Sequence, residues 1–153
     1  MKQTGAQVIL ICALVFLFLI MPVDVIDVRD ESGSRIFCAS GDTRYLSRNS
    51  IYGVTVSEAW AIDSGVITIV RVSSTPIVLD YYGIESYRVD ADGTASGAPK
   101  DLHYNEVRMK VTARGEQLLV IGNWKLEMSK NFEEGTVLII KPRRMIRIIA
   151  CVL

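Results

Sequence analysis

Residues Val54–Val72 read VTVSEAWAIDSGVITIVRV and carry the clearest strand signals in the chain. The first half, Val54–Ile62, places apolar side chains at every second position except one, which is the period of a strand with one buried face. Asp63-Ser64-Gly65 follows and is typical of a hairpin turn. The second half, Val66–Val72, is the richest β-branched run and favours a second strand. The stretch therefore predicts two antiparallel strands joined by a tight turn.

Further runs of the same kind continue on both sides of this hairpin. Turn residues separate them at intervals of roughly 8–12 residues, which is typical of sandwiches and barrels. No long segment after Arg35 combines helical periodicity with caps. We therefore predict an all-β domain, an antiparallel β-sandwich or a barrel-like fold. The other expected strands are Arg35–Cys38, Thr43–Asn49, Ile77–Tyr82, Ser86–Val89, Leu102–Val111, Leu118–Ile121, Trp124–Glu127, Thr136–Ile140 and Met145–Val152.

Two connections between these strands have distinctive compositions. The stretch Asp92–Asp101 (DGTASGAPKD) is the longest expected loop, and it is the best candidate for a mobile tip. The stretch Lys141–Arg144 (KPRR) is expected to be a basic turn before the last strand. A basic turn could contact lipid headgroups or acidic partners, but we favour a solvated turn that discourages edge-to-edge aggregation.

The N-terminal segment Val8–Val23 (VILICALVFLFLIMPV) contains no charged residue, and all its members except Pro22 are apolar. With Gly5, Ala6 and Gln7, a helix over this segment is about 28 Å long, close to the ~30 Å hydrocarbon core of a bilayer. We predict an uncleaved transmembrane anchor, because no small-residue cleavage site follows the apolar run. The alternatives are a cleaved secretory signal and a buried helix of a soluble protein.

This interpretation divides the chain into an anchor over 1–23, a linker over 24–34 and a β domain over 35–153. Lys2 precedes the apolar run, whereas Asp24, Asp27 and Asp30 follow it. Basic residues are retained on the cytoplasmic side of a membrane. We therefore expect a single-pass protein of the cytoplasmic membrane, with its N-terminus inside and its C-terminal domain outside.

Charge and cysteine content narrow the functional classes. Only Lys2 of the 17 Lys and Arg residues lies in the first 23 residues, whereas all 17 Asp and Glu residues follow them, so the remaining 130 residues have a net charge near −1. A general nucleic-acid-binding protein would be basic, so nucleic acid is not an expected partner. Cys38 and Cys151 either form a disulfide outside the cell or remain separate buried thiols.

Glu58 is the exception in the alternating strand. Period two places it on the same face as Val54, Val56, Trp60 and Ile62. If that face is the core, Glu58 is buried and needs a partner, because an unpaired buried carboxylate is costly. We expect an ion pair with Arg71 or Arg48. The functional alternative is a carboxylate that binds a ligand at the mouth of a sheet.

Positive signals for catalysis or metal binding are absent from the sequence. His103 is the only histidine, so no His-Cys cluster can form, and no nucleophile or phosphate-binding motif occurs. Asp90-Ala91-Asp92-Gly93 resembles part of a calcium loop but lacks the further oxygen ligands. We expect no cofactor, no metal and no enzymatic activity. Aromatic side chains could line an apolar ligand pocket or pack in the core: Trp60, Tyr81, Tyr82, Tyr87 and Trp124.

The segment Asn49–Trp60 reads NSIYGVTVSEAW and is followed by the hairpin turn and a β-rich run. It resembles a small uncharacterised membrane-associated family that accompanies TAXI-type TRAP transporters. The pattern of that family is His-Ser-Val, two free positions, Thr-Pro-Val, one free position and Glu. Ser50, Val56 and Glu58 match this pattern.

The chain also departs from the family pattern. Asn49 replaces the histidine, Val54 and Thr55 replace the Thr-Pro pair, and Gly83 alone corresponds to a later Gly-Ala-Gly. The resemblance implies a non-enzymatic accessory or binding module at the outer face of the cytoplasmic membrane, near the subunits of a TRAP-type solute importer. With the strand analysis, it makes four residues candidate ligand or partner contacts: Asn49, Ser50, Glu58 and Arg71. The alternatives are an anchored or secreted hydrolase with an unrecognised site and a purely structural envelope protein.

Overall fold

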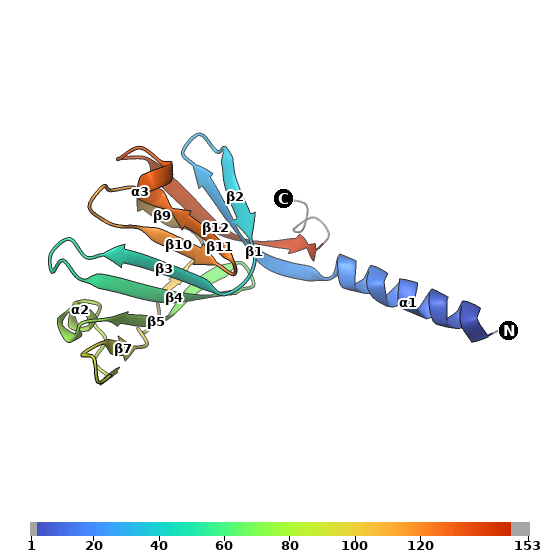
Figure 1. Cartoon of the computed structure of the whole chain (residues 1–153), viewed down its shortest axis with the longest axis horizontal. Coiled ribbons are helices and arrows are strands. Elements are labelled where there is room, and N and C mark those ends of the chain that lie inside the picture. The colour runs from blue at the N-terminus through green and yellow to red at the C-terminus, as the bar shows by residue number, and fades with distance from the viewer. Residues whose placement is uncertain (1–2, 148–153) are drawn as a thin grey trace.

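The computed structural model of the chain describes residues 3–147, which contain two antiparallel sheets packed face to face (Figure 1). One sheet has four strands in the order β2-β1-β12-β9. The other has eight, in the order β11-β10-β3-β4-β5-β7-β6, with β8 also paired to β5. Every pairing in the described part of the chain is antiparallel. The prediction of an all-β, sandwich-like domain is therefore confirmed.

The four-stranded sheet is built around the first and last strands of the domain. β1 pairs with β12 along its whole length, from Pro22 opposite Ile146 to Asp30 opposite Leu138. Most of the expected linker over 24–34 is therefore strand. That expectation was wrong because Val25, Ile26 and Val28 lie between the acidic residues and supply buried apolar side chains for a strand that pairs with β12. The bounds are β1 Pro22–Asp30, β2 Arg35–Ala39, β9 Val107–Lys110 and β12 Val137–Ile146.

The central hairpin of the eight-stranded sheet is the one that the sequence predicts. β4 and β5 pair from Asp63 opposite Val66 to Ser57 opposite Ser73, with a bulge between Ala59 and Trp60. The bounds of the eight strands are β3 Thr43–Arg48, β4 Thr55–Asp63, β5 Val66–Ser74, β6 Tyr87–Val89, β7 Ala95–Gly97, β8 His103–Tyr104, β10 Leu118–Ile121 and β11 Trp124–Glu127.

The hydrophobic core lies between the sheets, as alternation predicts. β1 contributes Ile26 and Val28, and β12 contributes Leu138 and Ile140. The eight-stranded sheet supplies the opposing side chains, which include Val56, Trp60, Ile67, Ile69, Leu119 and Ile121. Because successive strand residues point to opposite faces, the residue between Ile26 and Val28 faces away from the core.

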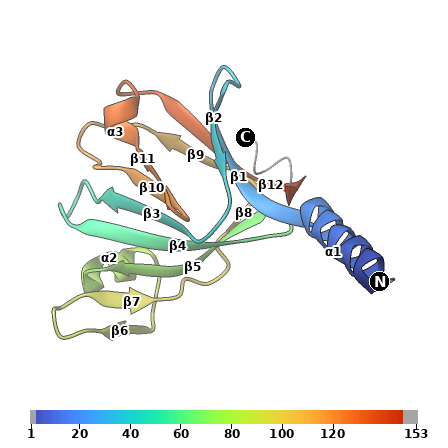
Figure 2. The same ribbon diagram turned by 45° about the vertical axis from the view of Figure 1, so that its right-hand side comes forward.

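Helix α1 (Gln3–Ile20) projects away from the sandwich and continues into β1 after a bend at Met21 (Figures 1 and 2). Its large apolar side chains from Val8 to Phe18 are 53–72% exposed. The Arg147 guanidinium lies 4.0 Å from the centre of the Phe18 ring. Among the described residues, no helix reaches the length and hydropathy that a membrane crossing requires.

One expected strand is a helix. Ile77–Tyr82 lies largely in α2 (Pro76–Tyr81), which follows Thr75, and α3 (Met128–Asn131) adds one turn after β11. Proline is favoured in the first turn of a helix because its fixed φ fits and its missing N–H is not needed there. The β-branched residues of α2 suggested a strand, but Pro76 and the burial of Val78 and Leu79 favour the helix.

The expected turn over 141–144 is also absent, because β12 continues through it to Ile146. Pro142 is tolerated in this strand for a positional reason. β9 pairs only with Val137–Ile140, so beyond Ile140 β12 pairs with β1 alone and one of its edges is free. A proline at such an edge breaks no ladder hydrogen bond on the free side. The expected last strand beyond residue 147, including Cys151, lies outside the described residues.

The expected mobile loop over 92–101 contains β7. Ala95 is fully buried, and Ala95–Gly97 pairs with both β5 and β6. Gly97 has no room for a side chain, because an added Cβ would lie 2.5 Å from the Ile84 Cγ2 atom. The small residues that suggested mobility therefore allow close packing at the edge of the sheet.

Candidate functional site

Glu58 lies in the middle of β4 and points into the sandwich. It sits opposite Tyr45 of β3 and Val72 of β5, and it is 8% exposed. The prediction that Glu58 is at least partly buried is therefore confirmed. Its neighbours on the same strand face, Val56 and Trp60, are also buried.

The partners of Glu58 are neutral hydrogen-bond donors. Trp60 Nε1 donates to Glu58 Oε2 at 2.9 Å, and the Tyr82 hydroxyl donates to Oε1 at 2.9 Å. The expected ion pair is wrong for both candidates. Arg48 instead bonds to Glu116 Oε1 and the Gly53 carbonyl. Arg71 sits opposite Ala59, which places it on the outer face of the sheet.

A cleft of about 530 Å³ opens beside Glu58. β3, β4 and β5 form one wall, and edge strand β9 of the other sheet forms the opposite wall. The lining is mainly aromatic and aliphatic, with polar groups at a few positions. It comprises Tyr45, Glu58, Trp60, Ile69, Tyr82, Leu102, Tyr104, Glu106, Val107, Arg108, Met109 and Gln117. This composition is typical of small-molecule sites, in which few polar groups orient a largely apolar ligand.

A second polar network fixes the lining beside Tyr45. Gln117 Nε2 donates to the Tyr45 hydroxyl and to the Lys110 carbonyl, each at 3.1 Å. Gln117 Oε1 accepts the Thr112 N–H at 3.0 Å. The Tyr45 and Trp60 rings lie 5.9 Å apart between centroids, tilted by 37°. The buried polar atoms beside Tyr45 are thus satisfied, which holds the aromatic wall in place.

The environment of the cleft shifts the titration of its tyrosines. Burial raises the pKa of Tyr82 well above its ordinary value, and the charge of Glu58 and the hydrogen bond to it raise this pKa further. Burial also raises the pKa of Tyr45. Both phenols therefore remain protonated at physiological pH, and Tyr82 remains a donor to Glu58.

We expect the protein to lose stability above pH 10, and Tyr82 to account for part of the loss. Its pKa is higher in the folded state than the ~10 of an unfolded tyrosine, so the stabilisation is complete below pH 10 and is lost as pH rises toward the folded pKa. Denaturant titrations between pH 8 and 11 measure this slope. Tyr82→Phe should flatten it, whereas Tyr81→Phe, at a 67% exposed side chain, should not. Equal slopes in all three proteins would contradict the prediction.

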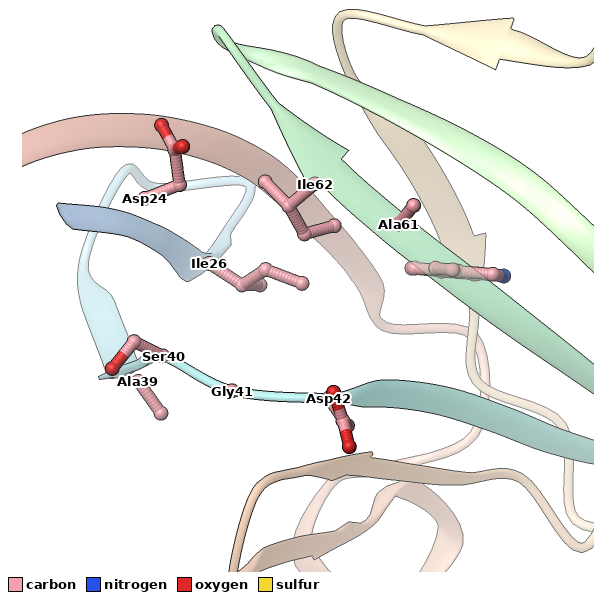
Figure 3. Close-up of a pocket in the computed structure, with 9 residues that line it drawn as sticks. Asp24, Ile26, Ala39, Ser40, Gly41, Asp42, Ala61 and Ile62 are labelled. Carbon is pink, nitrogen blue, oxygen red and sulfur yellow. The ribbon is translucent and has the colours of Figure 1, made fainter.

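A smaller cavity of about 220 Å³ lies between the first half of β1 and the end of β4 (Figure 3). It is lined by Asp24 and Ile26 of β1, by the β2–β3 connection and by the end of β4. The carboxylates of Asp24 and Asp42 point away from each other in this view. No group of three potential metal ligands occurs among the described residues. This cavity is therefore a weaker candidate for a ligand-binding site than the cleft beside Glu58.

The four residues predicted as contacts do not form one site. Asn49 and Ser50 lie in the β3–β4 turn, where Asn49 Oδ1 accepts the N–H groups of Ile51 and Tyr52. Arg71 lines a different, polar depression with Arg44, Ser57, Ala59 and Ser73. Glu58 alone lies in the cleft.

The five aromatic residues predicted to line a pocket or pack in the core also lie in different environments. Trp60 and Tyr82 line the cleft, whereas Tyr81 is exposed and Tyr87 packs against the core. Trp124 is exposed and lies against Phe37. Sequence reasoning missed Tyr45, Tyr104 and Gln117. For Tyr45 the available signal was its strand phase: it shares a face with Thr43, and the exposed Arg44 between them lies on the other face.

Comparison with protein-family models, with curated proteins and with solved structures finds no match to this chain.

Cys38 is a buried free thiol, and burial raises its pKa.

Proposed function

We propose that this protein is a non-enzymatic binding module held at a membrane surface by α1, and that its cleft binds a small organic cation with an apolar body. The single observation that supports this most directly is the chemistry around Glu58. A buried carboxylate bonds to two neutral donors, and no ion pair of Glu58 occurs within residues 3–147.

Glu58 retains the capacity to accept further hydrogen bonds. An ionised carboxylate offers about four lone-pair sites, and Trp60 and Tyr82 use two of them. A buried carboxylate without a cationic partner is costly, so a positively charged ligand group would be bound favourably there. Ammonium and guanidinium groups are the organic cations with donors suited to this role.

The aromatic lining favours the same ligand class. Cations are attracted to the faces of aromatic rings within about 6 Å, most strongly to tryptophan. Tyr45, Trp60, Tyr82 and Tyr104 line the cleft with Glu58. Ile69, Val107 and Met109 supply apolar surface for the body of the ligand.

Tryptophan fluorescence tests the binding proposal. The chain has two tryptophans, so a Trp124→Phe background leaves Trp60 as the reporter inside the cleft. The full chain in detergent should bind butylamine and should not respond to butanol. Glu58→Gln, which removes the charge, should weaken binding roughly tenfold or more. Glu116→Gln, at an exposed carboxylate, is the matched control and should bind normally. Equal responses to amine and alcohol would overturn the proposal.

The exposed apolar side chains of α1 support the proposed location at a membrane, independently of the cleft. An apolar surface of this extent is unfavourable in water and marks a membrane or protein interaction site. Although α1 falls short of the length and hydropathy of a membrane-crossing helix, its exposed apolar side chains support the proposed arrangement, with the N-terminus inside, α1 in the cytoplasmic membrane and the sandwich outside. The resemblance of Asn49–Trp60 to a TRAP-associated family supports transporter subunits as partners.

Experiments on intact cells and native membranes test this location and partnership together. The chain should remain with the membrane fraction after a carbonate wash, and protease added to intact cells should digest the sandwich. Mild-detergent pull-down should recover TRAP-type subunits. Replacing Leu14 and Leu17 by lysine should release the chain from the membrane, whereas alanine at the same positions should not. A soluble wild-type chain would overturn the anchor, and a pull-down without transporter subunits would overturn the partnership.

A further inference from the structure

A carboxylate surrounded by three arginines lies on the outer face of the four-stranded sheet. Asp27 sits between Ile26 and Val28, both of which point into the core, so Asp27 points the other way. It nevertheless has an exposed side-chain fraction of 0%. We call Asp27 with Arg29, Arg35 and Arg143 the arginine cluster.

The geometry of the arginine cluster is specific. Arg29 Nε and Arg143 Nε lie 2.9 and 2.7 Å from Asp27 Oδ2, and Arg35 Nε lies 2.9 Å from Oδ1. The arginines come from three strands: Arg29 lies on β1, Arg35 on β2 and Arg143 on β12. One carboxylate thus holds together three guanidinium groups from β2, β1 and β12, which are neighbouring strands of one sheet (Figure 2).

The cluster retains unused donors that reach solvent. Each guanidinium has five N–H groups, and each arginine approaches Asp27 through Nε. Arg29 Nη1 also donates to the Gly33 carbonyl at 3.2 Å. Within the part of the chain that the structure describes, no acceptor is found for the terminal nitrogens of Arg35 and Arg143. The arginine side chains are 30%, 30% and 45% exposed.

Charge is concentrated here in a chain whose formal net charge is zero. The cluster holds three positive charges and one negative charge, which leaves an excess of two. Beside it, Glu106 bonds to both Lys141 and Arg108, and the charge of Glu31 also acts on Arg108, so this neighbouring group is balanced and leaves the excess of the cluster in place. This face therefore carries a positive field that the composition does not indicate.

We propose that the arginine cluster binds a dianionic group of the phosphate type, carried by a soluble ligand. An excess of two positive charges matches a dianion, and forked guanidinium donors match its several oxygens. Asp27 lies seven residues after Ile20, which corresponds to about 23 Å of extended strand. If α1 lies in the membrane, this distance places the cluster beyond the headgroup layer, which extends roughly 5–7 Å past the hydrocarbon core.

Calorimetry on the full chain in uncharged detergent tests the proposal, with inorganic phosphate as the probe. Wild type should bind phosphate, and sulfate should compete with phosphate for the same site. The affinity for both anions should fall as the NaCl concentration rises from about 20 to about 150 mM. Arg143→Gln and Arg35→Gln should each weaken binding roughly tenfold, and Arg143→Lys should be intermediate. Arg114→Gln, at an exposed arginine in a turn, is the matched control and should bind like wild type.

Several outcomes would overturn the proposal. One is a folded wild type that binds no phosphate, and another is binding that both cluster variants leave unchanged. Vesicles with anionic phospholipids form the second arm of the experiment. Vesicle binding that depends on Arg143, without binding of free phosphate, would assign the cluster to lipid headgroups. Thermal melts establish that each variant is folded, and retained amine binding in Arg143→Gln separates this site from the Glu58 cleft.

Discussion

Asp27→Asn is expected to lower the free energy of unfolding by about 3 kcal/mol, at the low end for breaking a buried ion pair. The substitution leaves three guanidinium groups close together without their shared counter-charge. Two effects then add: the attraction to Asp27 is lost, and the repulsion among Arg29, Arg35 and Arg143 is no longer offset. The partial exposure of the arginines keeps the cost from being larger. Denaturant unfolding of the full chain in detergent measures it.

The matched control for Asp27→Asn is Glu116→Gln. Glu116 pairs with Arg48 at 2.9 Å, but both side chains are at least half exposed. Exposed pairs contribute little, so Glu116→Gln should unfold close to wild type. The double variant Asp27→Asn with Arg143→Gln should be less destabilised than the sum of the single changes, because removing one arginine relieves repulsion. An Asp27→Asn protein as stable as wild type would contradict the argument.

The second large effect is expected for Glu58→Leu, at about 2–3 kcal/mol of unfolding free energy. Leucine leaves the Trp60 N–H and the Tyr82 hydroxyl without their acceptor, and an unsatisfied buried donor costs about 1–3 kcal/mol. The apolar side chain recovers part of this cost by burial. Glu58→Gln should cost only about 1 kcal/mol, because its amide oxygen still accepts one hydrogen bond.

The order of the Glu58 variants is the decisive observation. Fluorescence-detected unfolding in the Trp124→Phe background should rank wild type above glutamine and glutamine above leucine. Glu85→Leu, at an exposed carboxylate paired with Lys100, is the control for surface substitution and should change little. A leucine variant more stable than the glutamine variant would show that the two donors do not need Glu58.

Local periodicity predicted the position of Glu58 but not its partners. Alternation over Val54–Ile62 was sufficient to place the carboxylate inside, because the phase of a strand is a local property. The partner Tyr82 lies 24 residues away, just after α2, a helix whose residues Ile77 and Val78 favour a strand by local propensity. A buried carboxylate can also take neutral donors as its partners within the chain, and Trp60 and Tyr82 fill two of the acceptor sites of Glu58 without an arginine.

The arginine cluster shows a different limit of sequence reasoning. Asp24, Asp27 and Asp30 were interpreted as an acidic flank after an anchor, which made the segment a linker. Asp27 is instead buried by side chains from β2 and β12, and β12 lies more than 100 residues further along the chain. Only the register of three strands brings these groups together. A carboxylate on a strand face is therefore not evidence of exposure by itself.

The pairing of β1 with β12 has a consequence for biosynthesis. Pro22–Asp30 leaves the ribosome early, but its partner Val137–Ile146 is made last among the described strands. Contacts between segments so distant in sequence form slowly, because a long loop must close first. Until β12 is made, β1 lacks one of its two neighbouring strands, and Leu138 and Ile140 are missing from the core beside Ile26 and Val28. The four-stranded sheet therefore cannot form completely before β12 has been made, and a chain truncated before residue 137 should be recognised by chaperones and proteases as unfinished.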